Sequence, residues 1–196
     1  AGIAVYNDGA IAVRKKAGRL VNLAEEVKAH PVVGTLGIGH TRWATHGGPS
    51  DVNAHPHTDE KGNFAIVHNG IIENYMELKE ELLKKGYHFK SETDTEVVAH
   101  LCADMYDGDF TSTVRKVLAC LRGSYSLVFM CKFEPDKIIC SKKDNPLIIG
   151  LGQGENYIAS DIPAILSYTR KTYIMNDGEI AIVMKDNVWV TDLEGK

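Results

Sequence analysis

Residues 40–49, HTRWATHGGP, hold the densest group of chemically capable side chains in this sequence. The planar guanidinium group of Arg42 can bind a carboxylate through two parallel hydrogen bonds. Thr45 and His46 can hydrogen-bond a polar ligand, and the glycines that follow let backbone amides approach it. Trp43 could wall off such a site or gate it. The alternative is a surface loop in which the arginine and the tryptophan only pack together.

Two further segments carry groups suited to an amide or an amino acid. Asn69 and Gly70 place a side-chain amide beside a backbone N–H, and such donors suit a developing oxyanion. Asn-Gly is also a common turn dipeptide, so the dipeptide alone favours a turn. Asp94 falls in the first turn of a predicted helix, where the helix polarity already favours a carboxylate. If Asp94 lay opposite Arg42, the pair would bind a zwitterionic amino acid.

Four histidines, His40, His46, His55 and His57, raise the alternative of a metal site. An extended His-Pro-His segment could place the imidazole rings of His55 and His57 on one face, as a zinc site requires. No cysteine lies nearby in the sequence, and the remaining spacings match no familiar zinc pattern. We therefore favour hydrogen bonding to the loop backbone and expect no metal.

The four cysteines form no CxxC pair and are too sparse for a disulfide scaffold. Two fall on apolar stripes of predicted helices and two in predicted strands, where a buried cysteine behaves as a small hydrophobic residue. We predict a core position for each of Cys102, Cys120, Cys131 and Cys140.

Composition indicates a globular domain. The 196 residues are 44% hydrophobic, and this length suits one domain with a sizeable core. The net charge of −4 gives no electrostatic footprint for nucleic acid or for an anionic membrane. No apolar run approaches the roughly 18 residues that a membrane span needs, and no signal peptide opens the chain. We expect a cytoplasmic protein without nucleic-acid or membrane partners.

The elements that must position these side chains are strands with interspersed helices. Apolar runs predict strands over 2–6, 10–14, 32–40, 64–67, 124–132, 137–141, 147–151, 157–159, 172–175, 179–184 and 188–191. Stripes at helical spacing predict helices over 19–29, 75–85, 112–121 and 162–167. A further helix is predicted to open with a capping box of Thr93 and Glu96. Tight turns favour antiparallel pairing, so we predict an α+β fold with helices packed on antiparallel sheets.

Several motifs occur together and in order. They are 40–47 (HTRWATHG), 53–57 (NAHPH), 67–74 (VHNGIIEN), 91–96 (SETDTE), 121–125 (LRGSY), 146–151 (PLIIGL) and 159–161 (ASD). This set closely resembles the glutaminase domains, of the class II glutamine amidotransferase type, in the glutamine:fructose-6-phosphate aminotransferase family. The resemblance covers essentially the whole chain, residues 1–196. It implies an N-terminal-nucleophile hydrolase fold, a four-layer αββα sandwich of mainly antiparallel sheets.

The resemblance also implies roles for the residues singled out above. Arg42 would hold the α-carboxylate of L-glutamine, and Asp94 would hold its α-ammonium group. Thr45 and His46 would line the glutamine pocket, and Trp43 would sit on a mobile loop that closes over the substrate.

The resemblance assigns the catalytic donors as well. Asn69 and Gly70 would form the oxyanion hole, and His55 would brace the mobile loop. The reaction would be attack of a thiolate on the side-chain amide, release of ammonia and hydrolysis of a glutamyl thioester. No cofactor and no metal is implied.

The start of the chain departs from the family pattern. The family nucleophile is a cysteine at the mature N-terminus whose own α-amine serves as the base, whereas this sequence begins with Ala1. Residues 1–16 instead resemble the segment that follows a Tyr-Arg-Gly-Tyr-Asp-Ser motif of the family. We expect the nucleophile, its first strand and another substrate-loop arginine to lie outside this sequence.

The function implied by the resemblance is hydrolysis of L-glutamine to glutamate and ammonia. The ammonia would pass to fructose 6-phosphate, making glucosamine 6-phosphate, on a C-terminal sugar-phosphate isomerase domain of the same polypeptide. That domain is not among these residues, and a homo-oligomer is compatible with the resemblance. Two alternatives stay open: a non-catalytic fragment that binds an amino acid, and a glutaminase domain that serves another acceptor.

Overall fold

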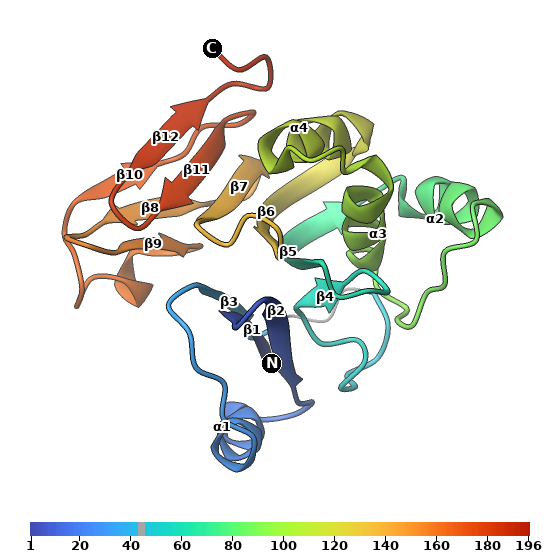
Figure 1. Ribbon diagram of the computed structural model, residues 1–196, viewed down its shortest axis with the longest axis horizontal. Coiled ribbons are helices and arrows are strands. Elements are labelled where there is room, and N and C mark those ends of the chain that lie inside the picture. Colours follow the sequence, from blue (N-terminus) through green and yellow to red (C-terminus); the bar gives the residue numbers. More distant parts are fainter. Residues whose placement is uncertain (43–45) are drawn as a thin grey trace.

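A six-stranded antiparallel sheet forms the centre of the computed structural model, which describes residues 1–42 and 46–196 (Figure 1). Its strands are, in spatial order, β12 (Val188–Thr191), β11 (Ile180–Met184), β7 (Lys137–Lys143), β6 (Gly123–Cys131), β5 (Phe64–Ile72) and β4 (His57–Thr58). The longest pairing joins β5 to β6, with Phe64 opposite Cys131 and Ile72 opposite Gly123.

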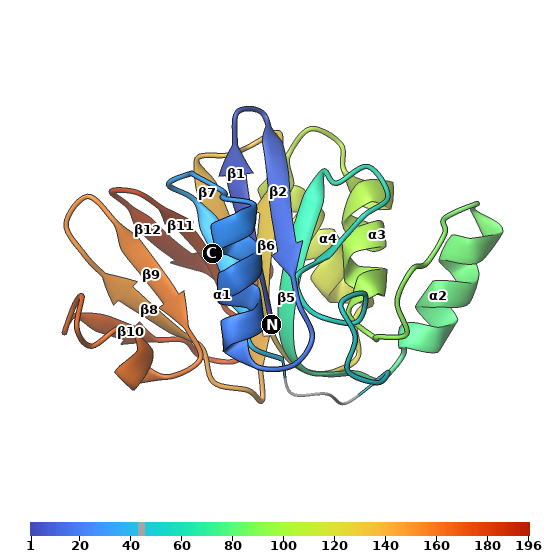
Figure 2. The same ribbon diagram turned by 90° about the horizontal axis from the view of Figure 1, so that it is seen from below.

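The described residues also form two three-stranded antiparallel sheets on one side of the central sheet. One has the order β2 (Ala10–Lys15), β1 (Gly2–Asn7) and β3 (Gly37–His40). The other has the order β10 (Thr172–Ile174), β8 (Ile148–Leu151) and β9 (Asn156–Ala159), and a 3₁₀ turn, η1 (Ile162–Ala164), follows β9. Helix α1 (Leu20–Ala29) lies on the outer side of the sheet formed by β1, β2 and β3 (Figure 2).

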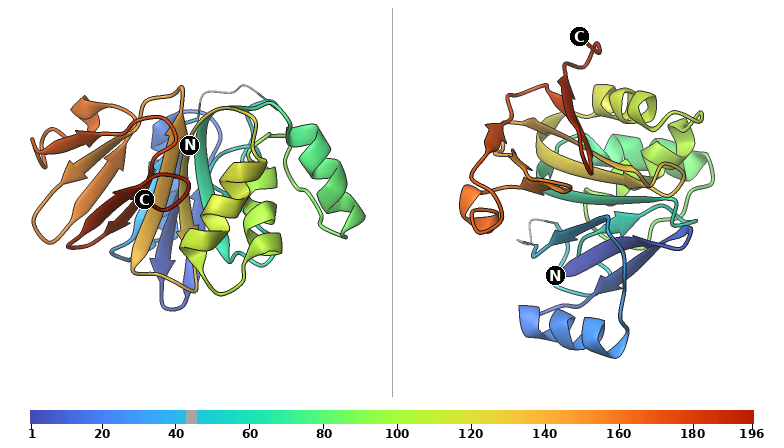
Figure 3. Two further views of the ribbon diagram at one scale, coloured as in Figure 1. Left: turned by 90° about the horizontal axis from the view of Figure 1, so that it is seen from above. Right: turned by 60° about the vertical axis from the view of Figure 1, so that its left-hand side comes forward.

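Helices α3 (Glu96–Met105) and α4 (Phe110–Cys120) cover the opposite face of the central sheet. Helix α2 (Tyr75–Lys84) packs beside α3 at the edge of this layer (Figure 2). Figure 3 shows the resulting order of layers, from α1 through the smaller sheets and the central sheet to α3 and α4. This arrangement confirms the predicted α+β class with antiparallel sheets flanked by helices. No helix in the described part of the chain is long and apolar enough to cross a membrane.

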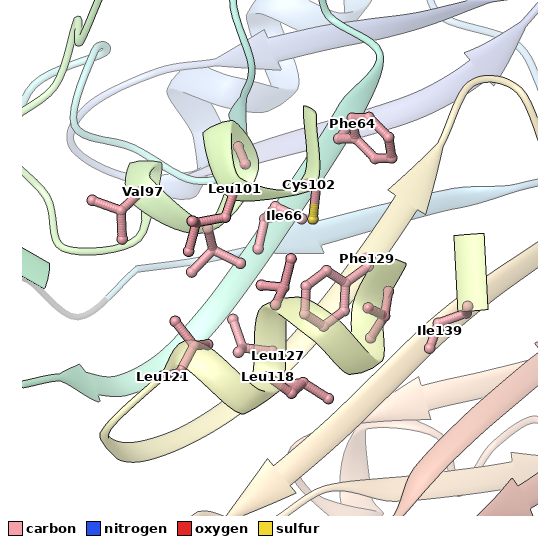
Figure 4. Packing of buried hydrophobic residues seen from close by; sticks show 14 of the residues in the cluster. Phe64, Ile66, Val97, Leu101, Cys102, Leu118, Leu121, Leu127, Phe129 and Ile139 are labelled. Atoms are coloured by element: carbon pink, nitrogen blue, oxygen red, sulfur yellow. The ribbon is translucent and has the colours of Figure 1, made fainter. Parts of the chain in front are cut away.

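Strand β5 contributes to two separate hydrophobic cores, because alternate side chains of a strand point to opposite faces. Phe64 and Ile66 pack with Phe129 in the core between the central sheet and the helices (Figure 4). Ala65 and Val67 pack into the second core, between the central sheet and the smaller sheets. The strand that leads to Asn69 and Gly70 is therefore held from both sides.

The predicted turn at Asn69-Gly70 was wrong. The strand predicted to end at residue 67 continues to Ile72, and both residues pair with β6. Gly70 has φ +116°, and a Cβ atom built on it would lie 2.2 Å from the carbonyl oxygen of Ser124. Glycine at this position thus allows close approach of a neighbouring strand rather than a chain reversal.

The predicted capping box was also wrong. Helix α3 begins at Glu96, and its N-cap residue, Thr95, makes no capping hydrogen bond through its side chain. The carboxylate of Glu96 instead accepts hydrogen bonds from the backbone N–H groups of Lys90 (2.9 Å) and Ser91 (2.7 Å). The hydroxyl of Thr93 lies 3.0 Å from Nε2 of His57. The buried carboxylate therefore organises the loop before the helix.

Other predicted elements match the structure with shifts at their ends. The strand predicted over 32–40 is confined to Gly37–His40, and the helix predicted over 162–167 is the short 3₁₀ turn. The predicted core position is confirmed for Cys102, Cys131 and Cys140. It was wrong for Cys120, which is only partly buried at the last turn of α4.

Candidate active site

A cavity of about 160 Å³ lies where the second half of β5 meets residues 40–42, His46 and the loop before α3. It is lined by His40, Arg42, His46, His55, His68, Asn69, Gly70, Thr93, Asp94 and Thr95. The structure therefore brings together six of the residues that the sequence singled out: Arg42, His46, His55, Asn69, Gly70 and Asp94. Trp43 and Thr45 lie outside the described residues.

Asp94 supplies the negative charge of the cavity. Its side chain is buried, and Oδ2 accepts a hydrogen bond of 2.8 Å from the backbone N–H of Ile72 at the end of β5. The other oxygen, Oδ1, lies 3.8 Å from Nδ1 of His46, which is too long for a hydrogen bond. A buried carboxylate needs further donors, so Oδ1 is suited to a cationic ligand group.

Arg42 lines the same cavity and supplies its positive charge. Its Nη2 donates to the carbonyl oxygens of His46 (2.6 Å) and Gly47 (3.0 Å), and its Nη1 donates to that of Gly48 (3.2 Å). Burial lowers the pKa of the guanidinium group, and the charge of Asp94 opposes this shift. Both N–H groups of Nη2 are engaged, so a two-bond grip on a carboxylate requires these carbonyls to give way.

Asn69 presents an oriented amide at the cavity. Its Oδ1 lies 2.7 Å from Nε2 of His40, a ring nitrogen that can donate to it. The side-chain NH₂ group is on the opposite side of the planar amide. Because Gly70 lines the same cavity, the two residues can together offer donors to one oxygen atom of a ligand.

A cluster of buried and half-buried histidines supports these groups. The ring of His55 stacks on that of His40, with centroids 4.4 Å apart, and meets the edge of His57 at 4.8 Å. Burial lowers the pKa of each of these rings, to about 3 for His57. The rings are therefore neutral at pH 7 and stack without charge repulsion. Nδ1 of His68 lies 2.9 Å from the hydroxyl of Thr95.

Four lining residues were not predicted as site residues: His40, His68, Thr93 and Thr95. All four lie inside the motifs quoted above, so motif membership was the signal that could have identified them. In the described part of the chain, no group of three or more His, Cys, Asp or Glu side chains is placed to hold a metal ion.

None of the cysteines lines the cavity. Cys102 and Cys140 are buried in the two cores, and burial raises the pKa of both thiols. Burial also raises the pKa of Cys131, to about 11. A thiol with a raised pKa is a poor nucleophile at neutral pH, so these three cysteines have structural roles.

The family model described as a glutamine amidotransferase domain matches residues 40–167, which is more than half of the chain and includes every residue of the cavity. The chain belongs to the glutamine amidotransferase domain family. This assignment confirms the resemblance drawn from the ordered motifs.

Relatives of this amidotransferase domain share about half of its residues. The chain is 55% identical over 196 residues to a glutamine–fructose-6-phosphate aminotransferase (isomerizing) of Caldanaerobacter subterraneus, covering 100% of this chain and 32% of the relative. It is 53% identical to the protein of the same name from Aquifex aeolicus, covering 100% of this chain and 33% of that protein. The chain thus spans about a third of the length of the curated relatives it matches.

Solved structures share the fold of this amidotransferase domain. An allosteric regulatory enzyme of purine biosynthesis matches with a TM-score of 0.83 and 28% identity, over 98% of this chain and 42% of the other. The glutamine phosphoribosylpyrophosphate amidotransferase of B. subtilis matches with a TM-score of 0.79 and 27% identity, over the same shares of the two chains. These matches confirm the predicted fold.

Proposed function

We propose that this domain hydrolyses the side-chain amide of L-glutamine to glutamate and ammonia. The observation that carries the proposal is the convergence of Asp94, Arg42 and the Asn69–Gly70 pair on one small cavity. A site that hydrolyses an amino acid with an amide side chain needs an anionic group for the α-ammonium, a cationic group for the α-carboxylate and donors for the oxyanion. These three groups have the required chemistry.

The charged pair would bind the ends of the substrate that do not react. Oδ1 of Asp94 would accept hydrogen bonds from the α-ammonium group, because Oδ2 is already bonded to the backbone of Ile72. Arg42 would bind the α-carboxylate by exchanging loop carbonyls for carboxylate oxygens. His46, Trp43 and Thr45 would complete the pocket from the same segment.

The reacting amide would lie next to β5. The NH₂ group of Asn69 and the backbone of Gly70 would stabilise the negative charge that develops on the amide oxygen. His55 would support the loop indirectly, because it stacks on His40, whose Nδ1 accepts a hydrogen bond from the backbone N–H of Arg42.

The nucleophile would come from residues outside this sequence. Among the described residues, β3 pairs only with β1 and β9 pairs only with β8, so each strand has an edge without a partner strand. A groove of about 230 Å³ runs between these edges, lined by residues 37–39 and 156–158 among others. A neighbouring cavity of about 410 Å³ is lined by Gly39, Ile158, His40 and Asn69. A strand placed there would bring a cysteine at its end to the oxyanion-binding groups.

The acceptor of the ammonia would be fructose 6-phosphate, on an isomerase domain of the same polypeptide. Relatives at 55% and 53% identity carry that activity in their names, whereas the matched purine-biosynthetic enzyme is only 28% identical. A glutaminase domain that serves another acceptor is the alternative, and comparing the aminated products of different acceptors separates the two.

Kinetics of the full-length protein that contains this chain test the proposal. Glutamate and ammonia should form from L-glutamine, and glucosamine 6-phosphate should form when fructose 6-phosphate is added. Asp94→Asn and Arg42→Ala should each lower kcat/KM for glutamine by at least about 100-fold, since each removes a charged hydrogen-bonding partner of a few kcal/mol. Asp186→Asn, at an exposed turn between β11 and β12, is the matched control.

Two outcomes would contradict the proposal. Unchanged kinetics in both site variants would show that the cavity is not the glutamine pocket. Binding of glutamine by the full-length protein without release of ammonia would support a non-catalytic amino-acid-binding module instead.

A further inference from the structure

His40 makes one hydrogen bond with each ring nitrogen, and the two bonds reach different parts of the cavity. Nδ1 accepts a hydrogen bond of 2.8 Å from the backbone N–H of Arg42. Nε2 lies 2.7 Å from the side-chain oxygen of Asn69. A single ring thus connects the segment that carries the guanidinium group to the strand that carries the oxyanion donors.

These two bonds define the tautomer of the ring. A backbone N–H can only donate, so Nδ1 of His40 must be the unprotonated nitrogen. The proton of the neutral ring is then on Nε2, which donates to Oδ1 of Asn69. Because the amide of Asn69 is planar, fixing its oxygen on His40 fixes its NH₂ group on the opposite side.

We propose that His40 is a positioning residue that sets the orientation of the Asn69 amide for catalysis. The proposal rests on the proposed glutaminase function, since the orientation matters only if Asn69 stabilises an oxyanion. Without His40 the amide could rotate by half a turn and present its oxygen, which would repel the developing negative charge. With His40 the donor is already aimed before the substrate arrives.

The surroundings of the ring hold it in this state. His55 stacks on His40 with an interplanar angle of 21°, and its own Nδ1 accepts a hydrogen bond of 3.3 Å from the backbone N–H of His68. A doubly protonated His40 would place an N–H against the N–H of Arg42, and burial of the ring also disfavours the charged form. The neutral tautomer is therefore the one that this structure accommodates.

The backbone of Arg42 gives the ring a second connection. Arg42 has φ +55°, a left-handed conformation that is uncommon for residues other than glycine, and its N–H is the donor to His40. A shift of the Arg42 backbone that broke this hydrogen bond would also remove one of the two bonds that orient the ring toward Asn69. His40 thus couples the substrate-binding segment to the oxyanion-binding strand.

Two substitutions separate the two hydrogen bonds in the full-length protein. In His40→Gln the side-chain NH₂ group can take the place of Nε2 and donate to Asn69. In His40→Asn the shorter side chain can only take the place of Nδ1, so the donor to Asn69 is lost. We expect His40→Asn to lower kcat for glutamine hydrolysis about 10- to 100-fold with KM changed less than about threefold. His40→Gln should keep kcat within about fivefold of the parent.

A double-mutant cycle with Asn69→Ala tests whether His40 acts through Asn69. If it does, His40→Asn should change kcat less than about threefold once Asn69 is alanine. Equal losses in His40→Gln and His40→Asn, or fully additive losses in the double variant, would overturn the proposal and indicate a general structural role. His88→Asn, at an exposed ring, is the matched control.

A measurement without turnover keeps this proposal distinct from the glutaminase proposal. ¹⁵N NMR of the histidine rings, assigned by comparison with His40→Gln, should show His40 with Nε2 protonated and Nδ1 unprotonated. The opposite tautomer would overturn the positioning role even in an active enzyme. If the protein has the expected tautomer but releases no ammonia, the hydrogen-bond geometry is correct and the glutaminase function is refuted. The catalytic role of His40 is then refuted as well.

Discussion

Replacing His57 by glutamine should make the free energy of unfolding less dependent on pH, because one proton fewer is taken up on unfolding. The ring of His57 is buried beside Thr93, and burial lowers its pKa from 6.5 to about 3. In the unfolded chain the ring is in water and titrates near its ordinary value of about 6.5. The unfolded state therefore binds the additional proton below that pH, and stability falls as the pH is lowered.

The magnitude follows from this pKa difference. At pH 7 the ring is mostly neutral in both states, so His57 contributes almost nothing to the pH dependence there. At pH 5 the unfolded ring is almost fully protonated while the folded ring, with a pKa of about 3, stays neutral. At about 1.36 kcal/mol per pH unit, the interval from 6.5 to 5 costs about 2 kcal/mol of folding free energy.

Urea unfolding followed by far-UV circular dichroism at pH 7 and pH 5 measures this loss. Between pH 7 and pH 5, the free energy of unfolding should fall by about 2 kcal/mol more in the parent than in His57→Gln. Glutamine keeps a polar group near Thr93 but cannot take up a proton in this range. Burial also lowers the pKa of His55 and His68, but both remain in the variant and cancel in the comparison.

An exposed histidine provides the control. The side chain of His88 is 85% exposed and lies beside Glu60 at the surface, so His88→Gln should lose as much stability between pH 7 and pH 5 as the parent. If His57→Gln lost as much stability as the parent over the same interval, His57 would not be a buried neutral ring.

Two substitutions test the packing around the site. Phe129→Ala should lower the free energy of unfolding by about 3–5 kcal/mol, because Phe129 is fully buried in the core under α3 and α4. A loss of less than about 1 kcal/mol in a urea titration would contradict this packing. Gly70→Ala should cost at least about 2 kcal/mol, because the position has φ +116° and the new Cβ would meet the carbonyl oxygen of Ser124. A melting temperature equal to that of the parent would show that β5 and β6 can separate there.

Apolar periodicity was sufficient to predict most of the helices and strands. It was not sufficient where a tertiary contact decides the local structure. The Asn69-Gly70 dipeptide favours a turn in isolation, yet pairing with β6 extends the strand through it. Glu96 has the spacing of a capping box with Thr93, yet the backbone N–H groups of Lys90 and Ser91 bind its carboxylate. Neither partner could be chosen from local sequence.

The site was predicted from motifs and only in part. Arg42 and Asp94 were paired as a hypothesis about charge, and the structure places both at one cavity. The roles of His40 and His68 could not be predicted, because their partners Asn69 and Thr95 are 29 and 27 positions away in the sequence. From sequence alone, a loop histidine that hydrogen-bonds the backbone cannot be distinguished from one that binds a metal or contacts an amide side chain. Only the folded arrangement separates these cases.

The position of β5 between two cores has a consequence for how this sequence can vary. Phe64 and Ile66 must fit the core beneath the helices, whereas Ala65 and Val67 must fit the core beneath the smaller sheets. Consecutive positions of the strand are therefore constrained by two independent cores. A library of random substitutions across residues 64–67 should therefore retain few functional members. Compensating changes in one core cannot rescue a misfit in the other. Variation in this domain should accumulate on the exposed faces of α1 and α2, leaving the strand that leads to the cavity nearly fixed.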